Sequence, residues 1–201
     1  MTNQSVWDAH YTRSRAQQLY PDENVVRLLK KEFGVLTAKS CALDLGAGSG
    51  RHLSLLSDHF ERVYACDFSE KSLRLYPRRK INATQVKIPE LPYLDASFDF
   101  ILCWGVLHYL SHEDATATVA EIRRALKANG SIFLTLRSDK DTHLKSQLST
   151  GDLREGYARL FTKEEALSFF DGFSQVKYGF ILRQILGEEL VVAHHVLWAK
   201  R

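Results

Sequence analysis

The chain has 201 residues, enough for one sizeable domain but too few for two domains with separate hydrophobic cores. Hydrophobic residues make up 45% of the chain and charged residues 25%, a balance typical of globular proteins that excludes a fibrous or disordered chain. The formal net charge of +3 falls well short of the concentrated basic surface of a dedicated nucleic-acid binder. We therefore expect one folded domain with no strong preference for nucleic acid.

The cysteines and the N-terminal residues indicate in which cellular compartment the protein is expected. Cys41, Cys66 and Cys103 stand in apolar, strand-like runs, and no Cys-x-x-Cys pair occurs. This pattern predicts reduced core residues in a cytoplasmic protein. The start of the chain lacks the charged-then-apolar pattern of a secretory leader, and no apolar stretch approaches the ~20 residues needed to cross a bilayer. We expect no membrane partner and no bound metal.

Apolar runs alternate with helical patterns through the first two thirds of the chain, which indicates strand–helix–strand units that build a parallel sheet. A first helix is expected between Asp22, which can cap it, and Gly34, which ends it. The strands are predicted at residues 41–45, 62–66, 84–87, 98–103, 131–136, 175–181 and 189–200.

Capping residues indicate where later helices begin: Ser69, Ser111 and Thr162. The helix after Ser111 is expected to carry Leu126 on its apolar face and to end at Asn129-Gly130, which turns the chain into the fifth strand. Residues 137–160 are polar and weakly patterned, so we interpret them as a variable connection on the substrate side.

A glycine-rich turn follows the first predicted strand. Gly46, Gly48 and Gly50 allow the backbone to turn tightly and to present its amides to a ligand. Their spacing fits the phosphate-binding pattern Gly-x-Gly-x-x-Gly poorly. Asp44, just before the first glycine, would repel a pyrophosphate but can accept a hydrogen bond from the ammonium group of a bound amino acid, directly or through water.

Asp67 ends the second predicted strand, about 20 residues after the glycines, where an acid can accept from both hydroxyls of a ribose. A ligand with a ribose and an amino-acid ammonium group but no pyrophosphate is S-adenosylmethionine (SAM). The two acids and the glycine turn together therefore predict a SAM site.

The sequence around this turn resembles the first motif of the class I SAM-dependent methyltransferases, and two further stretches resemble the small-molecule type of that family (methyltransferase type 11/25-like). The three stretches are Leu43-Asp44-Leu45-Gly46-Ala47-Gly48-Ser49-Gly50, Leu91-Pro92-Tyr93 with Ser97-Phe98-Asp99, and Leu126-Lys127-Ala128-Asn129-Gly130-Ser131. The resemblance covers roughly residues 23–136. It implies an α/β, Rossmann-like, seven-stranded and mostly parallel sheet with an antiparallel last strand and helices on both faces.

The resemblance also implies SAM as the cofactor and S-adenosylhomocysteine as the product. Together with the residue pattern it assigns cofactor contacts to Tyr11, Asp44, Gly46, Ala47, Gly48, Ser49, Gly50, Asp67, Phe68, Ser69, Lys87, Ile88, Cys103, Trp104, Gly105 and His108. Lys87 departs from the family, which often has an acid there to accept from the adenine amino group; an ammonium group cannot accept. Either the match slips by one residue along the third strand, or adenine is held by backbone groups around Ile88 and by Phe68.

Residues after the fourth strand border the expected site of chemistry. His108 is the candidate general base for a hydroxyl acceptor because the usual histidine pKa near 6.5 suits proton uptake at neutral pH; it could instead hydrogen-bond the loop or the cofactor carboxylate. His143 is a weaker candidate. His194 and His195 are neighbours on a strand, so at least one of them is expected to be structural.

The N-terminal segment, residues 1–21, carries Trp7, Tyr11 and Tyr20 and is interpreted as a lid over the cofactor or as a cap packed on the sheet. We expect residues 1–201 to form a single methyltransferase domain. The sequence does not indicate an oligomeric state.

The acceptor is expected to be a small molecule. Cys103-Trp104-Gly105-Val106 replaces the Asn/Asp-Pro-Pro-Tyr run of amino-methylating DNA enzymes, and no Pro-Cys pair of a cytosine-C5 enzyme occurs. Arg137 or Arg154 could pair with an anionic substrate. Two other functions stay open: a non-catalytic SAM-binding regulator or partner subunit, and an NAD-dependent oxidoreductase, which Asp44 and the glycine spacing oppose.

Overall fold

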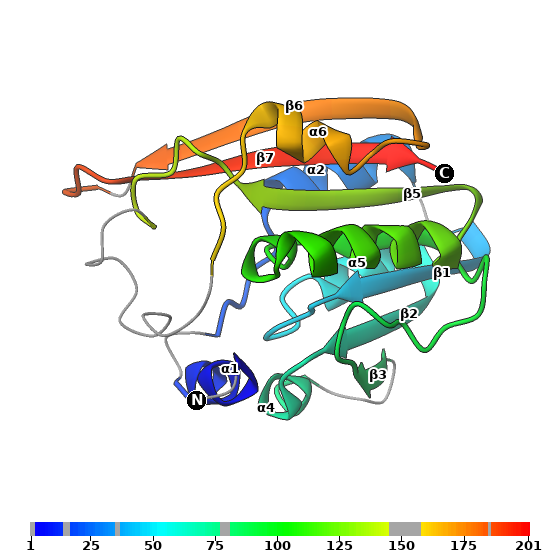
Figure 1. Cartoon of the computed structure of the whole chain (residues 1–201). Coiled ribbons are helices and arrows are strands. Elements are labelled where there is room, and N and C mark those ends of the chain that lie inside the picture. The colour runs from blue at the N-terminus through cyan, green and yellow to red at the C-terminus, as the bar shows by residue number, and fades with distance from the viewer. Residues whose placement is uncertain (1–2, 14–16, 35–36, 77–80, 145–157, 185) are drawn as a thin grey trace.

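A seven-stranded sheet forms the centre of the computed structural model, which describes residues 3–13, 17–34, 37–76, 81–144, 158–184 and 186–201 (Figure 1). The strands are β1 (Thr37–Leu45), β2 (Phe60–Asp67), β3 (Ile81–Gln85), β4 (Phe98–Cys103), β5 (Leu126–Arg137), β6 (Ser174–Gln184) and β7 (Val191–Lys200). The helices are α1 (Asn3–Tyr11), α2 (Glu23–Glu32), α3 (Leu53–His59), α4 (Glu70–Leu73), the 3₁₀ turn η2 (Leu107–Tyr109), α5 (His112–Ala125) and α6 (Lys163–Ser168).

The strand order is β3-β2-β1-β4-β5-β7-β6. Neighbouring strands from β3 to β5 run parallel, whereas β7 is antiparallel to both β5 and β6. The antiparallel last strand predicted from the family resemblance is thus confirmed. The order reverses between β1 and β4, and in open parallel sheets a ligand crevice forms beyond the carboxyl ends of the strands at such a point.

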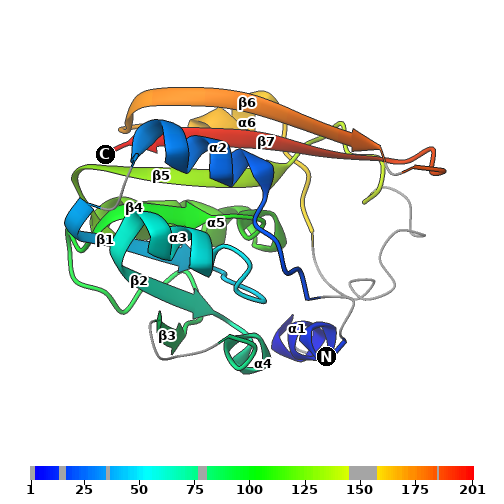
Figure 2. The ribbon, with the colours of Figure 1, turned by 180° about the vertical axis from the view of Figure 1, so that it is seen from behind.

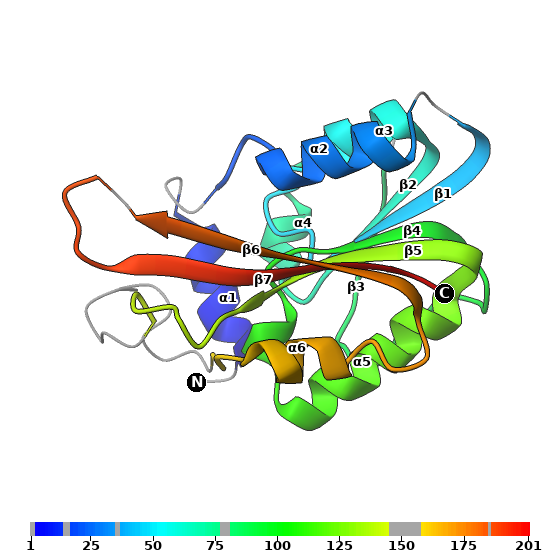
Figure 3. The same cartoon turned by 90° about the horizontal axis from the view of Figure 1, so that it is seen from above.

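Helices cover both faces of the sheet, with α2 and α3 over one face and α5 and α6 over the other (Figures 2 and 3). Side chains alternate along each strand, so Phe100 packs in the layer that contains α2 and α3, whereas Ile101 packs in the layer that contains α5. Asp22 caps α2 by accepting from the Asn24 amide, as predicted. The sheet is therefore buried between two apolar layers.

Several predicted boundaries were wrong by a few residues; β1, for example, begins at Thr37 rather than at residue 41. The third strand is Ile81–Gln85 rather than 84–87, because these residues pair with β2, and Lys87 therefore lies beyond the strand. Helix α5 ends at Ala125, so Leu126 begins β5. The Asn129-Gly130 turn lies inside β5, where the pairing with β4 shifts register.

Cys41, Cys66 and Cys103 are buried and free, as predicted. Among the described residues, no helix has the length and apolar character that a membrane crossing requires.

Candidate active site

The glycine turn joins β1 to the region before α3 and is tied to the end of β2. The amides of Gly46 and Ala47 both donate to the Cys66 carbonyl oxygen, at 2.8 and 3.0 Å. Gly48 adopts φ +56°, and a Cβ atom added there would lie 2.6 Å from the Tyr11 hydroxyl oxygen. The turn therefore excludes a side chain at Gly48 by its backbone conformation and by lack of space.

Asp67 links this turn to the start of α4. Its Oδ2 accepts from the Gly48 amide and its Oδ1 from the Ser69 amide, both at 2.8 Å. Burial raises the pKa of Asp67, and the amides of Ser69 and Gly48 oppose that rise. The Phe68 amide and the Ser72 side chain also lower the pKa of Asp67 through hydrogen bonds, so several donors hold this carboxylate at the end of β2.

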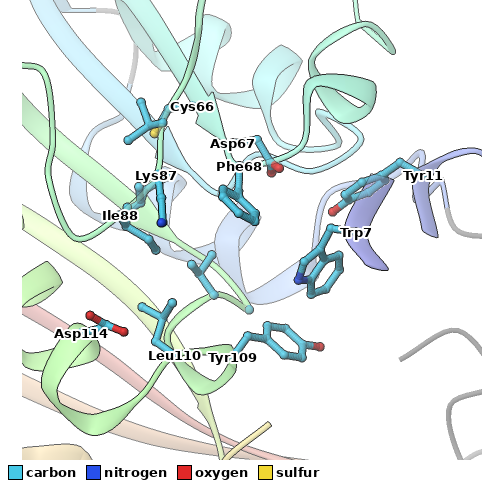
Figure 4. A pocket seen from close by; sticks show the side chains of 15 residues that line it. Trp7, Tyr11, Cys66, Asp67, Phe68, Lys87, Ile88, Tyr109, Leu110 and Asp114 are labelled. Atoms are coloured by element: carbon cyan, nitrogen blue, oxygen red, sulfur yellow. The ribbon is translucent and has the colours of Figure 1, made fainter. Parts of the chain in front are cut away.

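An apolar cavity of about 230 Å³ opens beside Asp67. Figure 4 shows Lys87, Ile88 and Asp114 at one end of it, Asp67 and Tyr11 at the other, and Phe68 between them. Its remaining lining residues are Trp7, Leu45, Gly46, Cys66, Val86, Gly105, Val106, Tyr109 and Leu110. The cavity lies at the carboxyl ends of β1, β2 and β4, where the topology predicts a ligand.

A second cavity, polar and of about 380 Å³, lies on the other side of the glycine turn. Residues 46–49 line one part of it, together with Arg51 and His52. Other lining residues come from the later strands and from η2: Trp104, Gly105, His108, Tyr109, Thr135, Arg137, Ile181, Arg183, Val192 and His194. The N-terminal region contributes Trp7, His10, Tyr11, Gln18 and Asp22.

Helix α1 lies where the two cavities meet, beside α4 (Figures 1 and 2). Trp7 and Tyr11 line both cavities. The helix is held in place by Trp7, whose ring meets the Tyr109 ring edge-on at 4.9 Å between centroids, and by Asp8, which accepts from the Ser69 hydroxyl at 2.5 Å. The N-terminal segment is thus part of the wall of both cavities.

Asp44 is 1% exposed and lies beneath the glycine turn. Burial raises its pKa to about 7, although Arg51 lowers it. Its Oδ2 has no hydrogen-bond partner among the described residues, and His52 Nδ1 is 4.0 Å away. Burial lowers the pKa of His52 to about 3, so this ring is neutral and does not balance the carboxylate charge. A buried carboxylate oxygen without a partner fits a cationic ligand nearby.

His108 is 1% exposed, and its Nδ1 has no partner among the described residues. Burial, with His194 and Arg137 nearby, lowers the pKa of His108 well below its usual value. The expectation of an ordinary pKa near 6.5 was therefore wrong, because the sequence did not reveal this degree of burial. His108 is a neutral hydrogen-bonding group at neutral pH and a weaker base than predicted.

The other histidines separate as the strand pattern predicted. His194 lines the polar cavity. His195 is on the opposite face, where its ring contacts the Phe161 carbonyl oxygen at 2.8 Å and the Tyr178 hydroxyl at 3.0 Å, which is a structural role. His143 lines neither cavity.

Residues 43–134 match the family model of a methyltransferase domain, and the strand order above is that of the class I fold. The chain has the class I methyltransferase fold, and residues 43–134 carry the sequence of a methyltransferase domain. A solved SAM-dependent methyltransferase from Anabaena variabilis has the same fold, with a TM-score of 0.74 and 16% identity over 100% of this chain and 96% of that one.

Two curated methyltransferases illustrate the range of relatives. Phosphoethanolamine N-methyltransferase 1 of Triticum aestivum is 27% identical over 144 residues, or 65% of this chain and 29% of that protein. The malonyl-(acyl-carrier protein) O-methyltransferase of Herminiimonas arsenicoxydans is 32% identical over 110 residues, or 53% of this chain and 41% of that protein. The matches span only 29% to 58% of the first curated relatives' length.

Most of the predicted cofactor residues of this methyltransferase domain line one or both cavities. The exceptions are Asp44 and Gly50, which lie within or below the turn, Cys103, which is buried in the core, and Ser69, which caps α4. Arg154 lies outside the described residues.

Several residues that line the two cavities carry no sequence signal that points to a site. Asp114 lies three residues after the predicted cap Ser111, a position that indicates only a helix start, yet it lines the same cavity as Lys87. Arg183 and Thr135 carry no motif, and only the packing of β5 and β6 brings them to the polar cavity.

Proposed function

We propose that this protein transfers the methyl group of SAM to a small-molecule acceptor by in-line displacement and releases S-adenosylhomocysteine. The observation that carries the proposal is the pair of cavities that meet at Gly46, Gly105 and α1. The apolar cavity suits a nucleoside, and the polar cavity suits the methionine end with an acceptor beyond it.

In the apolar cavity Asp67 would accept from the ribose hydroxyls, while Phe68 and Ile88 would pack against adenine. Asp114 supplies the carboxylate that Lys87 cannot. Its Oδ2 accepts from the Ser111 hydroxyl at 2.8 Å, which leaves Oδ1 to accept from the adenine amino group. The acid would thus come from the first turn of α5 instead of from the segment after β3.

At the methionine end, the carboxylate of Asp44 would balance the positive charge of the SAM ammonium group. Because Asp44 does not line the polar cavity, this contact would pass through water, one of the two routes that the sequence left open. The glycine turn would contact the same end of the cofactor through its backbone amides. A side chain at Gly48 would collide with Tyr11, so only the backbone is available there.

SAM supplies an electrophilic methyl group on a cationic sulfur. The residues around it would act mainly by orienting the acceptor and excluding water, which suffices for much of a one-step displacement. Trp7, Tyr11 and Tyr109 would keep solvent out where the cavities meet. His108, neutral and with an Nδ1 that has no partner among the described residues, would help to orient the acceptor through a hydrogen bond.

A small acceptor is favoured because the polar cavity is of ordinary ligand size and Trp7, His10 and Tyr11 of α1 form part of its wall. The relatives named above act on phosphoethanolamine and on a malonyl group carried by a protein, so the family itself does not fix acceptor size.

The α1 segment is proposed to act as a lid. Deleting residues 1–20 should weaken SAM binding, because Trp7 and Tyr11 would no longer line the cavities. Unchanged affinity in titration calorimetry would reject the lid.

The test of the proposed function has two stages. Calorimetry should show binding of SAM and S-adenosylhomocysteine, and no fluorescence change with NADH. Incubation of SAM with a broad panel of small acceptors should then yield S-adenosylhomocysteine and a methylated product, both detected by mass spectrometry. Binding without transfer across the whole panel would favour the non-catalytic regulator, and NADH binding without SAM binding would favour the oxidoreductase.

A further inference from the structure

The polar cavity is also lined by side chains from η2 and from the ends of β5 and β7, to which the proposed contacts with SAM assign no role. We propose that the methyl acceptor bears an anionic carboxylate or phosphate group, bound by Arg137 and His108 at the carboxyl end of β5. This inference rests on the proposed function and names the chemical class of its acceptor.

Arg137 is the main anchor. Its side chain is 12% exposed, and it forms an ion pair with the fully buried Asp141. Asp141 is itself fixed, since it accepts from the amides of Leu144 and Ala193, both at 2.8 Å. The guanidinium therefore has a defined orientation, while its Nε has no hydrogen-bond partner among the described residues. A rigid guanidinium with an unused donor suits a carboxylate or phosphate.

His108 and His194 complete the anion-binding side. Their rings lie 6.1 Å apart between centroids, and both line the polar cavity with Arg137. Burial is the main cause that lowers the pKa of both rings, and the charge of Arg137 lowers both further, as expected if the three groups face a common space. The buried Nδ1 of His108 lacks a partner among the described residues, and a neutral imidazole can donate from one ring nitrogen to an anion.

The charges of the lining residues also favour an anionic ligand. Three arginines line the cavity, and the only acid among the lining residues, Asp22, pairs with Arg183 at 2.6 Å. Arg51 stands next to the glycine turn, where it can serve the carboxylate of the methionine end. Arg137 stands instead at the end of β5, next to β7, and is left for the acceptor.

The test uses the full chain saturated with S-adenosylhomocysteine, with the side-chain signals of His108 and His194 followed by NMR. Benzoate and inorganic phosphate serve as anionic probes, and benzamide as the neutral probe matched to benzoate. We expect saturable shifts with at least one anion and none with benzamide. A response to benzoate alone identifies a carboxylate acceptor, and a response to phosphate alone a phosphorylated one.

Arg137→Lys is the informative variant, because it keeps a positive charge opposite Asp141 but removes the Nε donor and the planar fork. Binding of the anion should weaken about tenfold, since a charge-assisted hydrogen bond is lost. Arg74→Gln is the matched control: this exposed arginine also pairs with an acid four residues away but lines neither cavity, and its loss should leave anion binding unchanged.

Three results would overturn the inference: equal binding of benzamide and benzoate, no saturable shift with either anion, or unchanged anion binding in Arg137→Lys. If Arg137→Lys weakens binding of S-adenosylhomocysteine instead, the guanidinium serves the cofactor; the inference then fails and the proposed function stands. If the wild-type protein does not bind S-adenosylhomocysteine, the proposed function fails, and the inference fails with it.

Discussion

The two cavities of the site differ in how the chain builds them. The apolar cavity is lined mostly by short segments that directly follow β1, β2, β3 and β4. The polar cavity draws on α1, the glycine turn and the ends of β5, β6 and β7, which are far apart in the sequence. A local sequence motif can therefore specify the apolar cavity, which we assign to the cofactor. The polar cavity, which we assign to the acceptor, depends on how distant elements pack.

The charges differ as well. Acids stand at both ends of the apolar cavity, Asp67 and Asp114, and suit the hydroxyl and amino donors of a nucleoside. Arginines and histidines dominate the polar cavity. Substitutions in the apolar cavity should therefore change the affinity for SAM with any acceptor, and substitutions in the polar cavity should change which acceptor is used.

The largest effect is expected for Gly48→Val, at the turn that both halves share. The new side chain would meet the Tyr11 hydroxyl and would strain a backbone at φ +56°. SAM binding should weaken about a hundredfold or more, equivalent to roughly 2.7 kcal/mol. Calorimetry on the folded variant measures this, and near-native affinity would contradict the assignment of the turn to SAM.

Asp67→Ala tests the apolar half alone. Loss of the ribose acceptor should weaken SAM and S-adenosylhomocysteine equally, by about tenfold or more, which is ~1.4 kcal/mol. Because Asp67 also accepts from the Gly48 and Ser69 amides, circular dichroism must show that the variant keeps its fold. If the variant lost affinity for only one of SAM and S-adenosylhomocysteine, the assignment of the apolar cavity to their shared nucleoside would be wrong.

The pH dependence of SAM binding tests Asp44. In the free protein burial raises the pKa of Asp44 to about 7. The ammonium group of bound SAM would favour the charged carboxylate and lower this pKa. Binding near pH 7 would therefore release a proton from Asp44. Affinity should therefore rise severalfold between about pH 5.5 and 7.5, and then fall as the SAM amino group, with a pKa near 8, loses its proton. Asp44→Asn should bind more weakly and lose the rise, and a rise retained in this variant would assign the titration to another group.

The smallest effect is expected for Asp114→Ala, which should weaken S-adenosylhomocysteine about threefold to tenfold by removing one acceptor at adenine. The analogue S-inosylhomocysteine lacks the amino group, so the preference of the wild type for the adenine form should shrink in the variant. Glu113→Ala is the matched control, since Glu113 is exposed in the same helical turn and lines neither cavity. Equal effects in both variants would indicate a change in the helix start only.

Much of the fold followed from local pattern. Buried parallel strands give continuous apolar runs, and caps such as Asp22 and Thr162 mark helix starts by their side-chain chemistry. The errors lay where pairing overrides local preference: β3 is short and half-exposed, so β2 fixes its register, and β5 begins at Leu126 because β4 pairs with it there. The helical pattern alone could not show that.

The glycine turn, Asp67 at the end of β2 and the resemblance to a family could all be identified from the amino-acid sequence, because those residues are adjacent to single strands and their geometry is local. The packing of distant elements was needed to show that Asp114 shares a cavity with Lys87 and that Arg137, His108 and His194 line one cavity. It also decided the charge state of His108, because the pKa of a histidine depends on burial and on neighbours that are distant in sequence.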